Sequence, residues 1–297
     1  MWIKSNSQIS DNIFQVMTPV SSHFLIYGVD KCGLIDAGVL GLGLVPAVQE
    51  FLEGRSLDYV FLTHCDADHI GGIFDLKIAF PNLKVVAGKL AKERLANQDF
   101  LKAAYARNWI IAQSFEISNL VVGKEWMQSI EVDLIVEEGE MFNLGGQVNV
   151  KAFSFAGHTK EQVGYYIPSD KALAAGEAFG FFGGRDKEFP SFRFYEDYVA
   201  SLNKVAKLDL NILSLAHNGV LTGEMVTKFI HKSLSVTQSF KEQVQERLKA
   251  GETQDEIFNT ILQEWRSLEI APEGPFVAEQ KSLLKEMLAA VINSPAI

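Results

Sequence analysis

The sequence has few cysteines, an excess of acidic over basic residues, and no long hydrophobic run. Its two cysteines, Cys32 and Cys65, cannot form a disulfide framework, so we expect a reducing, cytoplasmic setting. Lysine and arginine number 27 against 37 aspartates and glutamates, and this net charge of −10 would repel a nucleic acid. The longest nearly unbroken apolar run, residues 38–48, is far shorter than the roughly 20 residues that span a bilayer. These features predict a protein that binds neither nucleic acid nor membrane.

The 297 residues, of which 47% are hydrophobic, are enough for one large or two modest domains with a filled core. Short β-type runs alternate with helical patterns through the first three quarters of the chain, and helical patterns alone follow. We therefore expect an α/β body over residues 1–221, with a helical insertion at about 90–130. A helical extension over 222–297 is predicted to pack over the active site. Predicted strands are 13–17, 23–27, 33–36, 58–62, 83–87, 134–136, 148–155, 164–167, 172–175 and 212–216, and predicted helices of the body include 45–52 and 195–206.

Histidine is scarce as well, and its placement is informative. Of six histidines, four follow a predicted strand: His64 and His69 after 58–62, His158 after 148–155, and His217 after 212–216. Strand ends along one sheet edge are where the sites of α/β proteins assemble. The remaining two, His23 and His231, lack this setting and are interpreted as structural.

The turn at 63–72, Thr-His-Cys-Asp-Ala-Asp-His-Ile-Gly-Gly, has the spacing of a metal site. His64 and Asp66 are two residues apart, so an extended backbone points them the same way and they can share one ion. Asp68 and His69 lie where a helix begins and can serve a second ion. Glu177, at the end of strand 172–175, is the best candidate to bridge the two. Imidazole and carboxylate ligands suit zinc, iron or manganese, and two such ions can hold a hydroxide between them.

Simpler explanations exist for each residue taken alone. A histidine after a strand is usually an ordinary loop residue, and the turn could be a capped helix start with Asp68 as N-cap. Ordinary structural roles for all of these residues at once are improbable, because four histidines share one setting and three carboxylates accompany them in the sequence. Cys65 is expected to pack under the loop. Asp36, which ends another strand, could either support the site as a hydrogen-bond acceptor or cap a turn, and both remain open.

Taken together, these motifs resemble the metallo-β-lactamase-fold superfamily of metal-dependent hydrolases. They run in the family's order from Leu-Ile-Asp-Ala-Gly at 34–38, through the turn at 63–72, Gly-His-Thr at 157–159 and Gly-Glu at 176–177, to Ala-His-Asn-Gly at 216–219. The helical tail is similar to those of the quinolone-signal response thioesterase and of glyoxalase II. The resemblance implies an αββα sandwich of two mixed sheets with helices outside.

The resemblance also implies a ligand set with two departures from the usual pattern. An aspartate, Asp66, stands where a second histidine is usual, and a glutamate, Glu177, stands where a bridging aspartate is usual. The resulting oxygen-richer set favours iron or manganese over zinc more than the usual set does. The implied ligands are His64 and His158 for the first ion, and Asp68, His69 and His217 for the second, with Asp66 and Glu177 as the two substituted positions.

The predicted activity is hydrolysis of a thioester, ester or lactone carbonyl by a metal-bridging hydroxide, with Asp68 orienting the hydroxide and two transition-metal ions, iron or zinc or else manganese, as cofactors. Two alternatives remain open. One is a di-iron redox protein similar to flavodiiron reductases, and the other is a non-catalytic effector that binds a ligand. The predicted partner is a small molecule with an apolar acyl group, and a homodimer stays open as the oligomeric state.

Aromatic residues follow Glu177 directly and are predicted to wall the substrate pocket, since an apolar, lidded pocket suits an acyl group. Core packing for the C-terminal helices is at least as good an explanation for half of these rings. The predicted pocket residues are Phe179, Phe181 and Phe182, with Met225 and Phe229 on the next helix.

Overall fold

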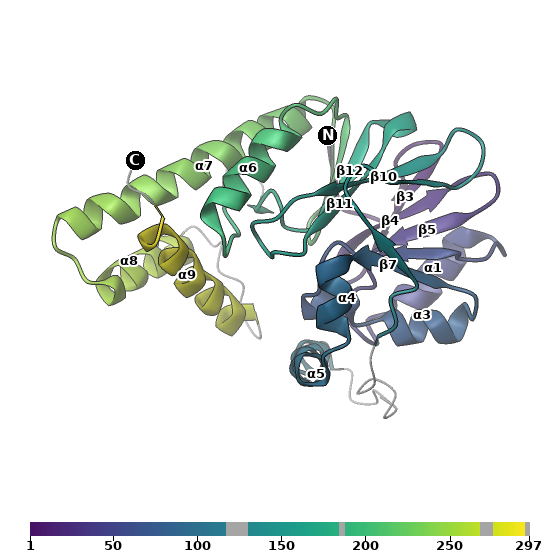
Figure 1. The fold of residues 1–297 in the computed structure, drawn as a ribbon, viewed down its shortest axis with the longest axis horizontal. Coiled ribbons are helices and arrows are strands. Elements are labelled where there is room, and N and C mark those ends of the chain that lie inside the picture. The colour runs from purple at the N-terminus through teal and green to yellow at the C-terminus, as the bar shows by residue number, and fades with distance from the viewer. Residues whose placement is uncertain (117–129, 184–187, 268–275, 295–297) are drawn as a thin grey trace. The chain divides into compact units, whose positions relative to one another are not determined.

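The computed structural model describes residues 1–116, 130–183, 188–267 and 276–294 and contains two seven-stranded sheets (Figure 1). The chain divides into two compact units. Both large sheets belong to the first unit, and most of the C-terminal helical residues belong to the second. The predicted boundary between a body at 1–221 and an extension at 222–297 stays a prediction. The first unit comprises residues 1–154, 161–176 and 209–226, and the second comprises 155–160, 177–208 and 227–297.

The first sheet is mixed. Its strands from β2 to β5 pair in antiparallel fashion, whereas those from β5 to β8 run parallel. The parallel half places the ends of β5 and β6 side by side, with Ile35 opposite Phe61. The strands in spatial order are β2 (Ser7–Gln8), β3 (Ile13–Met17), β4 (Ser22–Tyr27), β5 (Cys32–Ile35), β6 (Tyr59–Phe61), β7 (Lys84–Gly88) and β8 (Leu134–Val136).

The second sheet is antiparallel except for one parallel pair, β12 with β15. Buried side chains from the two sheets, among them Phe24, Phe61 and Tyr165, form one continuous core. Its strands in spatial order are β1 (Trp2–Ile3), β16 (Gly219–Thr222), β15 (Ile212–Leu215), β12 (Ala172–Ala174), β11 (Val163–Ile167), β10 (Asn149–Ser154) and β9 (Met141–Asn143), with a short 3-10 turn, η2 (Pro168–Asp170), between β11 and β12.

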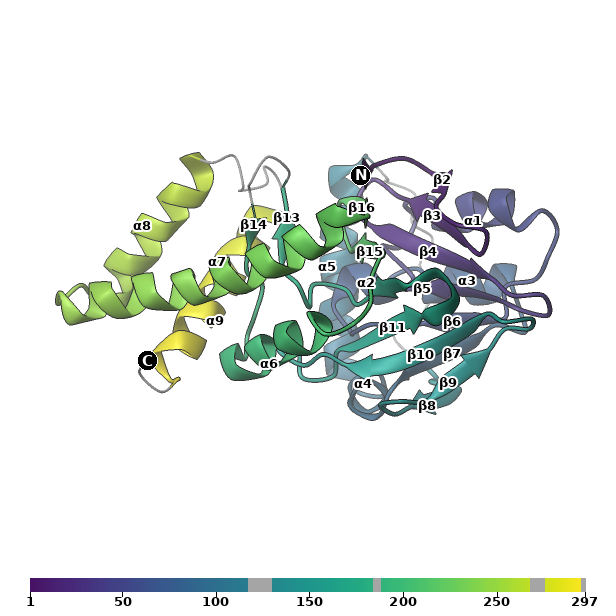
Figure 2. The same cartoon turned by 90° about the horizontal axis from the view of Figure 1, so that it is seen from above.

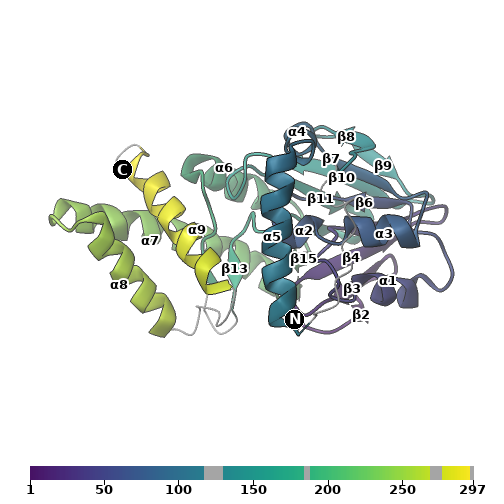
Figure 3. The ribbon, with the colours of Figure 1, turned by 90° about the horizontal axis from the view of Figure 1, so that it is seen from below.

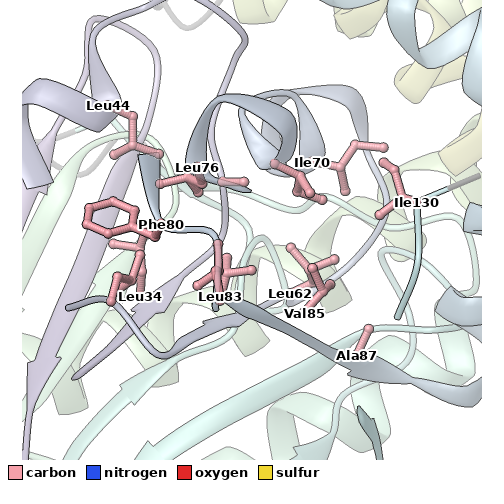
Figure 4. Packing of buried hydrophobic residues seen from close by; sticks show 14 of the residues in the cluster. Leu34, Leu44, Leu62, Ile70, Leu76, Phe80, Leu83, Val85, Ala87 and Ile130 are labelled. Atoms are coloured by element: carbon pink, nitrogen blue, oxygen red, sulfur yellow. The ribbon is translucent and has the colours of Figure 1, made fainter. Parts of the chain in front are cut away.

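Helices cover the other face of the first sheet, as Figure 3 shows. Leu44 and Leu76 from two of these helices lie opposite strand residues such as Leu34 and Val85 (Figure 4). Helices α4 and α5 fall in the predicted insertion at 90–130, of which 117–129 lie outside the described residues. The helices are α1 (Leu44–Leu52), α2 (Ala67–Ile70), α3 (Ile73–Ala79), α4 (Lys89–Leu95) and α5 (Gln98–Ser114).

The second unit is built from helices and a two-stranded hairpin (Figure 2). The ring of Phe192 lies 5.5 Å from that of Tyr198 and 5.7 Å from that of Phe240, measured between ring centres, and so joins two helices. The C-terminal helical region is interrupted between α7 and α8, at residues 250–253, and residues 268–275 lie outside the described residues. The elements are β13 (Phe181–Phe182), β14 (Glu188–Phe189), α6 (Tyr195–Val205), α7 (Glu224–Lys249, which begins in the first unit), α8 (Gln254–Ser267) and α9 (Phe276–Ile292).

The observed architecture is the predicted mixed α/β fold of two sheets with a helical C-terminal region. In the part of the chain that the structure describes, every helix is too short or too polar to cross a bilayer.

His23 on β4 is a buried histidine with a fixed tautomer. Its Nδ1–H donates to the Ile35 carbonyl oxygen at 3.0 Å, so its Nε2 accepts from the Ser21 hydroxyl at 2.8 Å. Burial lowers the pKa of His23 from 6.5 to about 4, against smaller raising contributions from the Ile35 carbonyl and from Asp36. The interpretation of His23 as a structural residue agrees with these contacts.

We expect His23 to make the folded state less stable in mild acid. Below pH 6.5 His23 becomes protonated in the unfolded chain, whereas in the folded chain it becomes protonated only at about pH 4. The free energy of unfolding should therefore fall by about 3 kcal/mol on this account as the pH drops through that window. Urea unfolding between pH 4 and 7.5, compared with His23→Gln, measures the difference in slope. Equal slopes in the two proteins would contradict the expectation.

Candidate metal centre

The turn after β6 places its acidic and histidine side chains at the start of a short helix. Asp66 is the N-cap of α2 in extended backbone and makes no side-chain capping bond, whereas Asp68 and His69 lie inside the helix. The alternative that Asp68 merely caps this helix is therefore wrong. The side chains of Asp66 and Asp68 keep part of their surface accessible, while His64 and His69 are buried.

Asp36 holds this turn in place through hydrogen bonds to its carboxylate. It follows β5 with φ 60°, a left-handed conformation that is uncommon for a residue with a side chain. Its carboxylate accepts hydrogen bonds from the Thr63 backbone N–H at 2.7 Å, the Thr63 hydroxyl at 2.8 Å and His69 Nδ1–H at 2.9 Å. Burial acts to raise the pKa of Asp36, but His69 and these hydrogen bonds outweigh it and hold the pKa below its usual value. Of the two roles left open for Asp36, the structure supports that of a hydrogen-bond acceptor.

This arrangement fixes the proton on two imidazole rings. A carboxylate can only accept, so His69 carries its proton on Nδ1 and presents the lone pair of Nε2. The Thr63 hydroxyl donates to Asp36 and hence accepts from His64 Nδ1–H at 3.0 Å. His64 Nε2 then faces Asp66 Oδ2 at 3.8 Å, and His69 Nε2 faces Asp68 Oδ2 at 3.8 Å.

His217, two residues after the end of β15, joins the same cluster. Its Nδ1–H donates to the Val20 carbonyl oxygen at 2.9 Å, which leaves Nε2 facing Asp68 Oδ2 at 3.4 Å. The ligand atoms of Asp68, His69 and His217 all lie within 4.8 Å of one another. The first unit thus brings together three of the predicted ligands, with His64 beside them at 4.1 Å from His69 between ring centres.

The second unit holds the other two predicted ligands. His158 Nδ1 lies 2.8 Å from the Ser191 hydroxyl and 3.1 Å from the Ser191 carbonyl oxygen, which can only accept. His158 Nε2 faces Glu177 Oε2 at 3.9 Å, and both side chains are buried. Gly157 permits this turn to lie close to α6, since a Cβ there would stand 2.4 Å from the Cα of Tyr198.

The donor atoms fit divalent ions. Two ligands held about 2.1 Å from a tetrahedral ion are about 3.4 Å apart. The four imidazole-to-carboxylate distances run from 3.4 to 3.9 Å, longer than the usual N–H···O hydrogen bond and close to that separation. In every pair the other imidazole nitrogen is held by an oxygen, as is usual for metal-binding histidines. We infer that the residues present suit transition-metal ions.

Sequence reasoning missed the residue that fixes the backbone of the turn. Asn108 on α5 is completely buried, donates to the Ala67 carbonyl oxygen at 2.6 Å and accepts from the Leu40 N–H at 3.0 Å. The one available signal was a polar residue on the partly apolar face of the helix predicted within 90–130. Cys65 is buried in the core, as expected, and burial raises the pKa of its thiol well above the usual value.

The predicted pocket residues are mostly packed aromatic rings. Phe182 lies 5.5 Å from Phe229 between ring centres, and Phe179 packs against Phe155 at 5.9 Å. Phe181 is half-buried and stacks on Phe189 at 4.9 Å. These contacts within the second unit match the core-packing alternative for Phe179 and Phe182. Met225, near the start of α7, is half-buried, and a role in substrate binding stays a prediction for all five.

Comparison with known proteins settles the family. The family model described as the metallo-beta-lactamase superfamily matches residues 18–217, which span every predicted metal ligand. The chain belongs to the metallo-beta-lactamase superfamily. The predicted family and fold class are therefore confirmed.

Individual relatives of this superfamily are distant. The metallo-beta-lactamase fold-containing protein ST1585 of Sulfurisphaera tokodaii is 24% identical over 241 residues, which cover 80% of this chain and 86% of the relative. The crystal structure of ST1585 matches with a TM-score of 0.59 over 96% of this chain and 100% of that one. A hydroxyacylglutathione hydrolase of Rhodopseudomonas palustris is 25% identical over 134 residues, 45% of this chain and 38% of the relative. A beta-lactamase domain protein of Burkholderia ambifaria matches with a TM-score of 0.67 at 14% identity, over 97% of this chain and 87% of that one.

Proposed function

We propose that this protein is a binuclear metal-dependent hydrolase of a thioester, ester or lactone. The observation that carries the proposal is the matched set of imidazoles. Each of the four is held through Nδ1 and presents Nε2 to a carboxylate oxygen at 3.4 to 3.9 Å. Structural histidines such as His23 instead have both ring nitrogens bonded to oxygen.

We propose that the ligands predicted from the sequence motifs serve one centre. They lie in the motifs at 63–72, 157–159, 176–177 and 216–219, which follow one another in the order that the superfamily resemblance implies. The proposed sites are His64, Asp66 and His158 for one ion and Asp68, His69 and His217 for the other, with Glu177 between them.

The bound ions would supply an activated water and polarisation of the carbonyl oxygen. The residues of the chain position the reactants. Asp68, which is partly accessible, would accept a hydrogen bond from the attacking water and so orient it toward the carbonyl carbon. As the water oxygen bonds to that carbon, the bond to the leaving sulfur or oxygen breaks, and the leaving group departs as a thiol or alcohol with one proton of the water.

The proposed substrate is an apolar acyl thioester. The distant relative named hydroxyacylglutathione hydrolase supports a thioester. Aromatic rings around Phe181 and Phe189, which directly follow Glu177 in the chain, support an apolar acyl group. The net charge of −10 favours neither polyphosphate nor nucleic acid as substrate.

The proposed metal is iron or zinc, with manganese as a further candidate, and the ligand set shifts the preference from zinc toward iron and manganese. Asp66 and Glu177 add oxygen ligands, and oxygen-rich sites favour the harder ions. The two substitutions also compensate in reach, because Asp66 is shorter than histidine and Glu177 is one methylene longer than aspartate.

Metal quantification of freshly purified protein, combined with turnover of octanoyl thioester, tests the proposal. We expect about two equivalents of transition metal per chain, loss of turnover after chelation, and recovery on metal return. Anomalous scattering at the iron and zinc edges identifies the ion. Metal-free protein that also resists reloading, or a loaded protein without hydrolytic activity on thioesters, esters and lactones, would refute the proposed function.

A further inference from the structure

Arg193, just before α6 in the second unit, lies against the metal-facing side of His158. Its Nη1 donates to the His158 carbonyl oxygen at 3.0 Å and stands 3.2 Å from His158 Nε2. That is the nitrogen assigned above to the first ion.

Two further contacts hold Arg193 in this position. Its backbone N–H and that of Phe194 both donate to the Gly157 carbonyl oxygen, at 2.9 and 3.0 Å, which joins the arginine to the turn of His158. Its Nε donates to Glu286 Oε2 on α9 at 2.6 Å. The guanidinium is three-quarters covered, so its place beside His158 is built into the unit.

Binding of a metal ion to His158 would change the hydrogen-bond acceptor available to the Arg193 guanidinium. An ion on His158 takes the lone pair of Nε2, so the Nη1–H that points at this nitrogen loses that acceptor close to the ion. Glu286 continues to hold Nε. The Nη1–H of Arg193, which stays positively charged, would then point past His158 Nε2 toward the ion. A negatively charged oxygen is the best acceptor at that position.

We propose that Arg193 is the anion-binding residue of the acyl site. It donates to the acyl oxygen while negative charge develops there and holds the carboxylate that hydrolysis releases. This inference rests on the proposed function and deepens it. The ligand chemistry it selects is an acyl group whose oxygen becomes anionic, rather than a neutral alcohol.

Calorimetric titration of the metal-loaded protein with octanoate, and separately with octanol, tests this inference without relying on activity. Charge-assisted hydrogen bonds of this kind are worth about 1.5–3 kcal/mol. We therefore expect Arg193→Gln to bind octanoate roughly ten- to a hundredfold more weakly, with octanol binding and metal content unchanged. Arg193→Lys keeps the charge without the planar fork and should recover part of the affinity.

The matched control is Glu286→Gln, which removes the ion pair and keeps the guanidinium on the turn of His158. Its loss of octanoate affinity should be smaller than that of Arg193→Gln. Equal losses in both, or unchanged octanoate affinity in Arg193→Gln at full metal content, would overturn the inference while leaving the hydrolase proposal intact. A wild-type protein that is loaded and active but does not bind octanoate would overturn it as well. Metal content and turnover of the wild type separately report the proposed function.

Discussion

Replacing His69 by alanine should remove one of the two metal equivalents and lower turnover by on the order of a thousandfold. His69 is one of the three residues assigned to the second ion alone, so its loss would leave Asp68, His217 and the proposed bridging residue Glu177 as ligands. The contribution of a bound ion to stabilising the transition state is several kcal/mol, and each 1.4 kcal/mol is a tenfold change in rate. Metal content by mass spectrometry and thioester turnover at saturating substrate measure the two effects.

The control for this variant is His23→Ala. His23 and His69 are about equally buried, at 1% and 2% exposure, so both variants remove the same imidazole from a buried position in the same unit. We expect His23→Ala to lower the free energy of unfolding and keep both metal equivalents. If His69→Ala retained the wild-type metal content, or if His23→Ala lost metal to the same extent, the assignment of His69 would be wrong.

Much of the fold could be predicted from the sequence because its core strands are short and apolar. Strand β3 was predicted with its observed bounds, and β4 to β7 differ from their predictions by at most one residue at each end. The strands β1, β2, β9, β13, β14 and β16 were missed. Four of them have only two residues, and such pairs are defined by their partner strand rather than by any local pattern.

In the candidate site, too, some features could be predicted from the sequence and others could not. Candidate ligands could be named from the sequence, since the spacing within 63–72 and the position of each histidine after a strand are local features, and their role as ligands stays a prediction. The supporting contacts could not, because they join residues far apart in the chain. Asn108 contacts Ala67 across 41 positions and His217 contacts Val20 across 197, and no sequence pattern specifies which carbonyl such a side chain meets.

Asp36→Asn should weaken metal binding at both proposed sites by roughly ten- to a hundredfold, the usual range for losing a group that orients metal ligands. Asp36 contacts His69 directly and His64 through the Thr63 hydroxyl, so one substitution reaches both. An asparagine offers a single oxygen where the carboxylate accepts three hydrogen bonds. If its NH₂ group faces His69, the ring must carry its proton on Nε2, and that nitrogen can then no longer bind an ion.

Competition with a chromophoric chelator measures both affinities of Asp36→Asn. Asp58→Asn is the matched control, because Asp58 also accepts a backbone N–H of the first sheet, that of Cys32 at 2.8 Å, and has no contact with the ligand histidines among the described hydrogen bonds and ion pairs. We expect Asp58→Asn to keep wild-type metal affinity. Unchanged affinity in Asp36→Asn would show that the imidazoles keep their tautomers without the carboxylate. The hydrogen-bond network beneath the turn would then serve folding alone, and the Nε2 atoms would owe their orientation to the oxygens of Thr63, Val20 and Ser191.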